Sequence, residues 1–234
     1  MNFELLEKLK DTTKEMTTFK LLSYLINQKS NDLAFATSLG AEDQVITEMI
    51  ASINSSARIF LLDTGRLFPE TYDLIERTNS RYKIRIKIYF PNTESIENMV
   101  NKKGINLFYN SIEDRKLCCR IRKIEPLKRT LKDVEIWITG LRNEQSEGRS
   151  EVSRIEWDAV NGLIKVNPLI DWSEKEVWDY IKEKNIPYNS LYKNAYKSIG
   201  CQPCTRAIDI DENPRAGRWW WENNGHKECG LHKG

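Results

Sequence analysis

Short apolar runs are spaced regularly along the first two thirds of this chain. Residues 33–37, 58–62 and 134–139 are apolar and rich in β-branched or aromatic side chains, so each is expected to form a buried strand. At residues 84–90 apolar and polar side chains alternate, which predicts a strand with one exposed face.

The segments between these runs have the apolar spacing of helices. This spacing is found within residues 1–30, 43–53 and 69–82, and Pro69 suits the first turn of its helix. Strands that alternate with helices predict an α/β fold, with a mostly parallel sheet and helices on both faces.

The last third of the pattern predicts a hairpin and a capped helix. Residues 152–157 and 163–166 are joined through the pair Asn161-Gly162, which favours a short β-hairpin. Ser173 and Glu176 have the spacing of a capping box. The helix that follows is expected to bury its apolar side chains, which are Val177, Trp178, Tyr180 and Ile181.

Polar residues and glycines follow several predicted strands. Ser38, Asp63 and Gly140 each come directly after one, and parallel sheets bind ligands at the carboxyl ends of their strands. The turn with Gly40 leads into a helix whose N-terminus could bind an anion. That turn has no lysine, so it is not a Walker A loop.

Composition restricts the partners that this chain can have. Among 234 residues, 36 are basic and 34 acidic, and the net charge of +2 gives no reason to expect a nucleic-acid partner. Neither a signal peptide nor a membrane-spanning run is evident, so we expect a cytoplasmic protein without membrane contact. In that reducing compartment, paired cysteines favour metal binding or catalysis over a disulfide.

The five cysteines fall into three groups. Cys118 and Cys119 are adjacent, and Cys201 and Cys204 have C-x-x-C spacing, so four thiolates could bind a 4Fe-4S cluster or a structural zinc ion. Adjacent cysteines are awkward ligands for one zinc ion. Cys229 is left over in a polar tail and is a candidate nucleophile.

Basic residues concentrate beside the adjacent cysteines. Residues 115–132 include eight basic residues and one acidic residue, Glu125. If residues 116–124 are helical, Lys123 and Arg122 lie one turn beyond Cys119 and Cys118. Such cations would stabilise thiolates, although the same run could be an ordinary solvated helix face. Two further arginines in the loop 141–149 could clamp a phosphate.

Taken together, these motifs resemble those of the assimilatory adenylyl-sulfate reductases, within the family that also includes the phosphoadenylyl-sulfate reductases. The shared features are the adjacent cysteines, Gly-Cys-x-x-Cys, Arg-Ala-Gly-Arg-Trp and the terminal Glu-Cys-Gly-Leu-His. The loops at residues 38–43, 62–66 and 137–149 resemble the family's nucleotide and arginine loops.

The resemblance implies an adenine nucleotide α-hydrolase-like fold with a mobile C-terminal tail. It implies one domain over residues 1–234, with N-terminal helices (1–30), a nucleotide-binding core (31–199), and a cluster loop and catalytic tail (200–234). Cys118, Cys119, Cys201 and Cys204 would hold a 4Fe-4S cluster. The thiolate of Cys229 would attack adenosine 5'-phosphosulfate, and thioredoxin or glutaredoxin would then release sulfite. A homo-oligomer is expected from the family.

The resemblance also assigns substrate contacts. They are expected from the strand-end loops, the basic helix and the tail, namely from Ser38, Gly40, Asp63, Gly65, Lys123, Gly140, Arg142, Arg149, Arg215, Arg218 and His232. The role expected for the cluster is electrostatic and structural.

Two alternatives remain open at this stage. The chain could prefer, or also accept, the 3'-phosphorylated substrate, because no residue of the sequence settles that choice. More distantly, it could be a zinc-stabilised nucleotide-binding module without turnover.

Overall fold

The computed structural model describes residues 3–29, 31–145 and 152–222. Within it the chain divides into two compact units. The first comprises Met1–Leu61, Pro69–Lys87 and Asp133–Ser190, and the second comprises Leu62–Phe68, Ile88–Lys132 and Leu191–Gly234.

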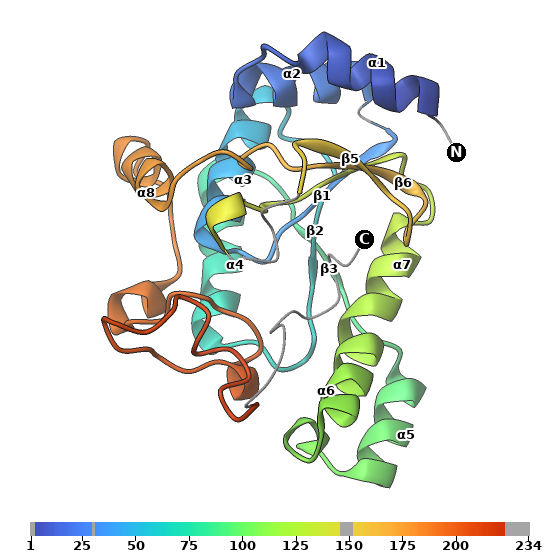
Figure 1. Ribbon diagram of the computed structural model, residues 1–234, viewed down its shortest axis with the longest axis vertical. Helices are drawn as coiled ribbons and strands as arrows, with labels where there is room; N and C mark the ends of the chain where they lie inside the picture. The colour runs from blue at the N-terminus through green and yellow to red at the C-terminus, as the bar shows by residue number, and fades with distance from the viewer. Residues whose placement is uncertain (1–2, 30, 146–151, 223–234) are drawn as a thin grey trace. The chain divides into compact units, whose positions relative to one another are not determined.

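The first unit is built on a mostly parallel sheet (Figure 1). Its six strands have the order β3-β2-β1-β4-β6-β5. Their bounds are β1 Leu33–Ala36, β2 Ile59–Leu62, β3 Lys87–Tyr89, β4 Ile136–Ile138, β5 Ile155–Asp158 and β6 Leu163–Val166. β1 pairs in parallel with β2 and β4, β4 pairs in parallel with β6, and β5 pairs with β6 as an antiparallel hairpin. The predicted fold class and hairpin are confirmed.

One strand is shorter than the alternating pattern predicted. Residues 84–90 are expected to be extended, but β3 covers only Lys87–Tyr89. Ile84 and Ile86 are buried as expected, yet the backbone N–H of Ile86 donates to the Asn79 side chain rather than to a neighbouring strand. A side-chain acceptor therefore replaces the first ladder bond of the strand.

The helices of the first unit largely follow the predicted bounds. They are α1 Phe3–Thr13, α2 Thr18–Lys29, α3 Ala41–Ile53, α4 Pro69–Tyr82 and α8 Glu174–Glu183. Residues 1–30, which were predicted to be helical, form two helices. The second begins after Thr17, whose carbonyl accepts from the Leu21 N–H and whose hydroxyl accepts from the Lys20 N–H. In Figure 1 α3 lies between α8 and α4.

Helix α8 begins at the predicted capping box. The Ser173 hydroxyl accepts from the Glu176 backbone, and the Glu176 carboxylate accepts from the Ser173 backbone. Val177 and Ile181 are buried, but Trp178 and Tyr180 are only partly buried, so the prediction that all four side chains are core residues is wrong for the two aromatic ones. Their rings pack on Tyr188 and Trp172 instead.

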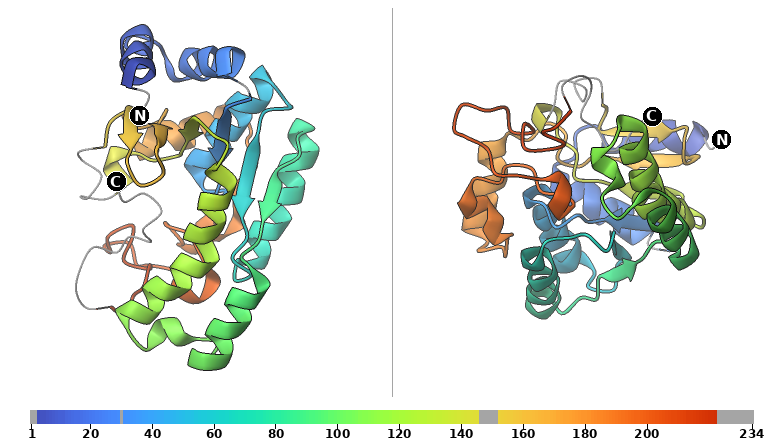
Figure 2. Two further views of the ribbon diagram at one scale, coloured as in Figure 1. Left: turned by 90° about the vertical axis from the view of Figure 1, so that its right-hand side faces the viewer. Right: turned by 90° about the horizontal axis from the view of Figure 1, so that it is seen from below.

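A long helical rod organises the second unit (Figure 2). It runs from α6 Ile112–Cys119 through a π-helical turn, η2 Arg120–Ile124, into α7 Glu125–Leu131. In a regular helix the ring of Pro126 would clash with the carbonyl four residues earlier, and the wider π turn avoids this clash. The regular helix predicted for residues 116–124 is therefore replaced by a π turn after Cys119.

The remaining elements of the second unit surround this rod. They are α5 Thr93–Lys103 and the short 3-10 turns η1 Leu107–Tyr109 and η6 Gln202–Cys204. Two further 3-10 turns are η3 Asn143–Gln145, in the first unit, and η5 Ser190–Asn194. Met99, Leu107, Phe108 and Ile121 form the unit's core together with Trp219. No helix in the described ranges is both long and apolar enough to cross a membrane.

Candidate active site

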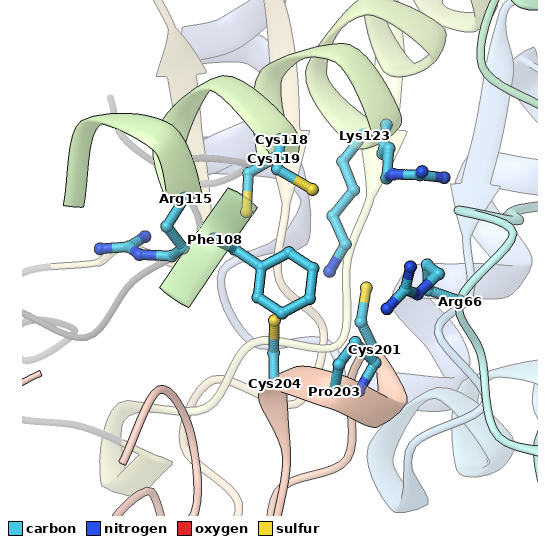
Figure 3. Close-up of a pocket in the computed structure, with 10 residues that line it drawn as sticks. Arg66, Phe108, Arg115, Cys118, Cys119, Lys123, Cys201, Pro203 and Cys204 are labelled. Atoms are coloured by element: carbon cyan, nitrogen blue, oxygen red, sulfur yellow. The ribbon is translucent and has the colours of Figure 1, made fainter. Parts of the chain in front are cut away.

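Four of the cysteines line one pocket in the second unit. Cys118 and Cys119 end α6, and Cys201 and Cys204 flank the turn η6. Figure 3 shows the two pairs on opposite walls, with their sulfur atoms directed into the space between them. None of the four forms a disulfide. The pocket is partly open to solvent and is lined by Arg66, Phe108, Arg115, Cys118, Cys119, Arg122, Lys123, Cys201, Pro203 and Cys204.

Hydrogen bonds hold the second pair of cysteines in place. The backbone N–H of Gln202 donates to the Arg66 carbonyl at 2.8 Å, and the Tyr109 hydroxyl donates to the Pro203 carbonyl at 2.8 Å. The Thr205 hydroxyl donates to the Cys201 carbonyl at 2.9 Å. These bonds tie the loop to the turn at residues 63–66 and to η1.

The π turn places two cations of the basic run at the pocket. Lys123 reaches in between the cysteine pairs (Figure 3), and Arg122 is buried. Arg122 Nη1 donates to the Thr64 carbonyl at 2.6 Å, which holds the guanidinium against the turn at residues 63–66. Arg122 and Lys123 therefore lie at the pocket and not on a solvated helix face.

The pocket gives its cysteines different acidities. Burial alone would raise the pKa of Cys201, but Lys123 and the Thr64 hydroxyl, with smaller effects from Arg218 and Arg122, bring it below its ordinary value. Cys204 has the opposite balance, because burial and then the charge of Cys201 raise its pKa to about 12. Burial likewise raises the pKa of Cys118, against the effect of Arg122.

Thr64 contacts Cys201 at the pocket, and the sequence did not single it out. It is fully buried, and its hydroxyl accepts from the Arg66 backbone N–H at 3.2 Å. The same oxygen lies 3.3 Å from Cys201 Sγ. Because the Arg66 bond uses Thr64 as the acceptor, the hydroxyl hydrogen remains available to donate to the Cys201 thiolate.

The neighbouring residues of this turn were predicted as substrate contacts. Asp63 Oδ1 accepts from the Gly65 backbone N–H at 2.7 Å. Gly65 has a φ of 69°, a left-handed conformation that favours glycine. Position 65 also lies close to the Arg122 guanidinium. The turn is therefore shaped by the Asp63 side chain and the conformation of Gly65, and it is held in place by Arg122.

Arg215 and Arg218 were also predicted as substrate contacts. Arg218 is buried, and its guanidinium lies 4.7 Å from the Trp219 ring centre, where it also donates to the Cys204 carbonyl. Arg215 is partly buried, and its backbone N–H donates to Asn213. The predicted residues Arg149, Cys229 and His232 lie outside the described ranges.

The predicted nucleotide loops of the first unit are organised by Asp43. Its carboxylate accepts from both the backbone N–H and the hydroxyl of Ser38, at 2.5 and 2.6 Å. A side chain at position 140 would collide with Asp43 Oδ1, so Gly140 provides the room that this carboxylate needs. Gly40 precedes α3 and donates to the Ser38 hydroxyl at 3.4 Å.

Arg142 is also fixed in the first unit. Its guanidinium is buried and donates to Glu42 at 2.8 Å, to Glu144 at 3.2 Å and to the Trp172 carbonyl at 3.2 Å. Glu42 and Asp43 therefore place two carboxylates in the first turn of α3, where the sequence suggested an anion site.

A model of the phosphoadenosine phosphosulfate reductase domain matches residues 32–207. The chain belongs to this family. The matched range includes the strands of the sheet and all four cysteines of the pocket.

Curated members of the family resemble the chain over most of its length. A protein of Allochromatium vinosum named adenosine 5'-phosphosulfate reductase is 52% identical over 221 residues, covering 94% of this chain and 86% of that protein. One of the same name from Neisseria meningitidis is 49% identical and covers 92% of this chain and 88% of that protein.

Solved structures agree with the family assignment. The phosphoadenylyl-sulfate reductase of Candida auris is 30% identical, with a TM-score of 0.74 over 89% of this chain and 98% of that one. Yeast FAD synthetase, at 12% identity and a TM-score of 0.56 over 87% of this chain and 74% of that one, shares the fold alone.

Proposed function

We propose that this protein is an oxidoreductase that reduces adenosine 5'-phosphosulfate to sulfite and AMP in sulfate assimilation. The observation that carries the proposal is the agreement of two findings. Relatives of that name are about half identical over nearly the whole chain, and the four cysteines that the motif predicts line one pocket beside Lys123.

We propose a 4Fe-4S cluster on Cys118, Cys119, Cys201 and Cys204. The donor set fits, because such clusters take four thiolates. The two pairs face each other from opposite walls of the pocket (Figure 3). Adjacent cysteines such as Cys118 and Cys119 are awkward ligands for one zinc ion.

A buried hydrogen-bond donor, the indole N–H of Trp219, also supports the presence of a sulfur-rich group in the pocket. Trp219 packs in one apolar cluster with Cys118 and Cys204, and its indole N–H has no acceptor among the described residues. A buried donor without a partner costs about 1–3 kcal/mol, which an electron-rich sulfur nearby would offset. When bound, the cluster would supply an electrostatic and structural link between α6 and the 201–204 loop.

The proposed chemistry needs one free thiolate. Cys229 Sγ attacks the sulfur of adenosine 5'-phosphosulfate, the bond from sulfur to the phosphate oxygen breaks, and AMP leaves with that electron pair. A thiolate of thioredoxin or glutaredoxin then attacks Cys229 Sγ, and sulfite leaves with the electrons of the sulfur–sulfur bond. The second thiol of the carrier resolves the mixed disulfide, so one dithiol provides both electrons.

Cations are needed because thiolate and sulfate are both negative. We propose that Lys123, Arg215, Arg218 and His232 screen the sulfate, since positioned charges lower the barrier in a pocket of low dielectric. We assign the binding of AMP to the strand-end loops and the arginine loop, through Ser38, Gly40, Asp63, Gly65, Gly140, Arg142 and Arg149.

The 3'-phosphorylated substrate remains the second candidate. It is favoured by the 30% identity to a phosphoadenylyl-sulfate reductase over nearly all of that chain. A cytoplasmic location and a homo-oligomeric assembly also stay predictions from the resemblance.

The substitution Cys229→Ser tests the proposed nucleophile. The variant is expected to keep its iron, its acid-labile sulfide and its affinity for AMP, but to release no sulfite, because serine at neutral pH offers no comparable nucleophile. Sulfite release at the wild-type rate would refute the assignment. Zinc in place of iron in the purified protein would support the non-catalytic alternative.

A further inference from the structure

Arg115 carries a charge in the interior of the second unit. It lies on α6, three residues before Cys118, and is 3% exposed. Its Nε donates to Glu222 Oε1 at 2.7 Å and its Nη2 donates to Glu222 Oε2 at 3.0 Å. Both side chains lost their hydrating water on burial. The ion pair is therefore stabilising only while both hydrogen bonds keep this geometry.

The same guanidinium contacts two other features of the site. It lies 4.6 Å from the centre of the Trp219 ring. Cys119, at the end of the same helix, also interacts with this guanidinium. In Figure 3 its guanidinium points away from Lys123 and Cys201.

The backbone between these contacts is also fixed. Trp219 is buried with a φ of 43°, a left-handed conformation that a bulky residue adopts only when its surroundings hold it there. The Glu222 backbone N–H donates to the Trp219 carbonyl at 3.0 Å. Residues 219–222 therefore form a turn that is held at one end by the buried Trp219 and at the other by the bonds of Glu222 to Arg115.

Cys229 is the seventh residue after Glu222 in the sequence. We propose that the Arg115–Glu222 ion pair acts as an anchor that helps to position Cys229, by fixing to the cysteine helix a point of the chain seven residues before it. Arg115 and Glu222 are thus positioning residues. The inference rests on the proposed role of Cys229.

The size of the effect can be bounded. If the ion pair is lost, Trp221, the residue before Glu222, still packs on Phe108 and Tyr109, so the chain is loosened at Glu222 alone. Misplacement of a reacting group by about 1 Å can cost about 100-fold. We expect a smaller loss, of about tenfold.

The test compares Glu222→Gln with a matched control. The glutamine keeps the shape of the side chain but turns an amide N–H toward the guanidinium. The control is Glu212→Gln, because Arg206 and Glu212 form the same kind of two-bond pair in the same unit, at 2.6 and 2.8 Å, but are only partly buried. Both proteins are prepared with their iron, and adenosine 5'-phosphosulfate is added without reductant.

Three quantities are measured. The first is the rate at which Cys229 becomes S-sulfonated, followed by mass spectrometry. The second is the affinity for AMP, together with iron content and the visible spectrum. The third is hydrogen exchange in a peptide that covers residues 219–222.

For Glu222→Gln we expect faster exchange, about tenfold slower sulfonation at saturating substrate, and unchanged AMP affinity and iron content. Glu212→Gln should match the wild type. Unchanged exchange would show that the pair is no anchor, and faster exchange with wild-type sulfonation would show that the anchor does not serve Cys229. Loss of iron would make the pair a support of the cysteine pocket instead.

The failure of the proposed function would look different. If the wild type itself formed no S-sulfonate, the proposed role of Cys229 would be refuted, and with it the proposed purpose of the anchor. The exchange measurement would still report whether Glu222 holds the turn.

Discussion

At the scale of single residues, Thr64 joins the turn after β2 to the cysteine pocket. Its hydroxyl accepts from Arg66 and faces Cys201 Sγ, and its carbonyl accepts from Arg122. Three contacts of one buried residue thus connect a predicted nucleotide loop, a thiolate and a cation of the basic run. Such a residue is hard to replace because each contact uses a different atom or lone pair.

The substitution Thr64→Val should weaken this connection. Valine keeps the volume but leaves the Arg66 N–H without its acceptor and removes a donor to Cys201, at a cost of about 1–3 kcal/mol in the free energy of unfolding. Urea unfolding and the rate of iron loss to a chelator measure the effect, and both are expected to change in the destabilising direction.

Thr64→Ser is the matched control, because it retains the hydroxyl. It should lie close to the wild type in both measurements. If Thr64→Val held its iron as firmly as Thr64→Ser, the hydroxyl would have no role in the pocket.

Several of these residues could not be identified from the sequence. Thr64 follows Asp63 in a turn that the pattern did predict, but its contact with Cys201 spans 137 positions. Arg115 belongs to the predicted basic run, but its partner Glu222 is 107 positions away. Periodicity and motif spacing carry information about neighbours in the chain, and neither specifies which distant acid meets which base.

At the scale of elements, the sequence predicts what local chemistry determines. The helix α4 has the predicted bounds because Pro69 starts it, and the hairpin β5–β6 forms around Asn161 and Gly162 as turn chemistry requires. The π turn after Cys119 was not predicted, because proline signals a break or kink but not the form it takes. That turn decides which way Arg122 and Lys123 point.

The contact between α3 and α8 depends on pH in a predictable direction. The Tyr180 hydroxyl donates to Glu48 at 2.8 Å, and burial, followed by the effect of Glu48, raises the pKa of Tyr180 above its ordinary value of 10.0. The folded state therefore favours the neutral phenol. Its stabilising contribution is complete below about pH 10 and is lost as the pH rises from there toward the folded-state pKa.

Tyr180→Phe tests this directly, because phenylalanine cannot titrate or donate. The wild type should exceed the variant in unfolding free energy by a constant amount between about pH 7 and pH 9, and the difference should shrink above about pH 10. Urea unfolding at several pH values measures it. A difference that stayed constant or grew in alkali would contradict the assigned direction.

At the scale of the whole molecule, charge is local rather than global. The chain as a whole has a net charge of +2, yet Arg66, Arg115, Arg122 and Lys123 all line the pocket that holds four cysteines. Any attraction of an anionic substrate must therefore come from local groups of cations and not from the overall field of the protein. The family could be predicted from the sequence because its motifs are contiguous, whereas the anchor at Glu222 required the folded chain.

The most direct test of the proposed function is sulfite release. Anaerobically purified, iron-containing protein is given reduced thioredoxin and either adenosine 5'-phosphosulfate or its 3'-phosphorylated form. We predict sulfite and AMP from the first substrate, and sulfite from both would extend the activity to the second. No sulfite from either substrate, with the iron present, would contradict the proposed function.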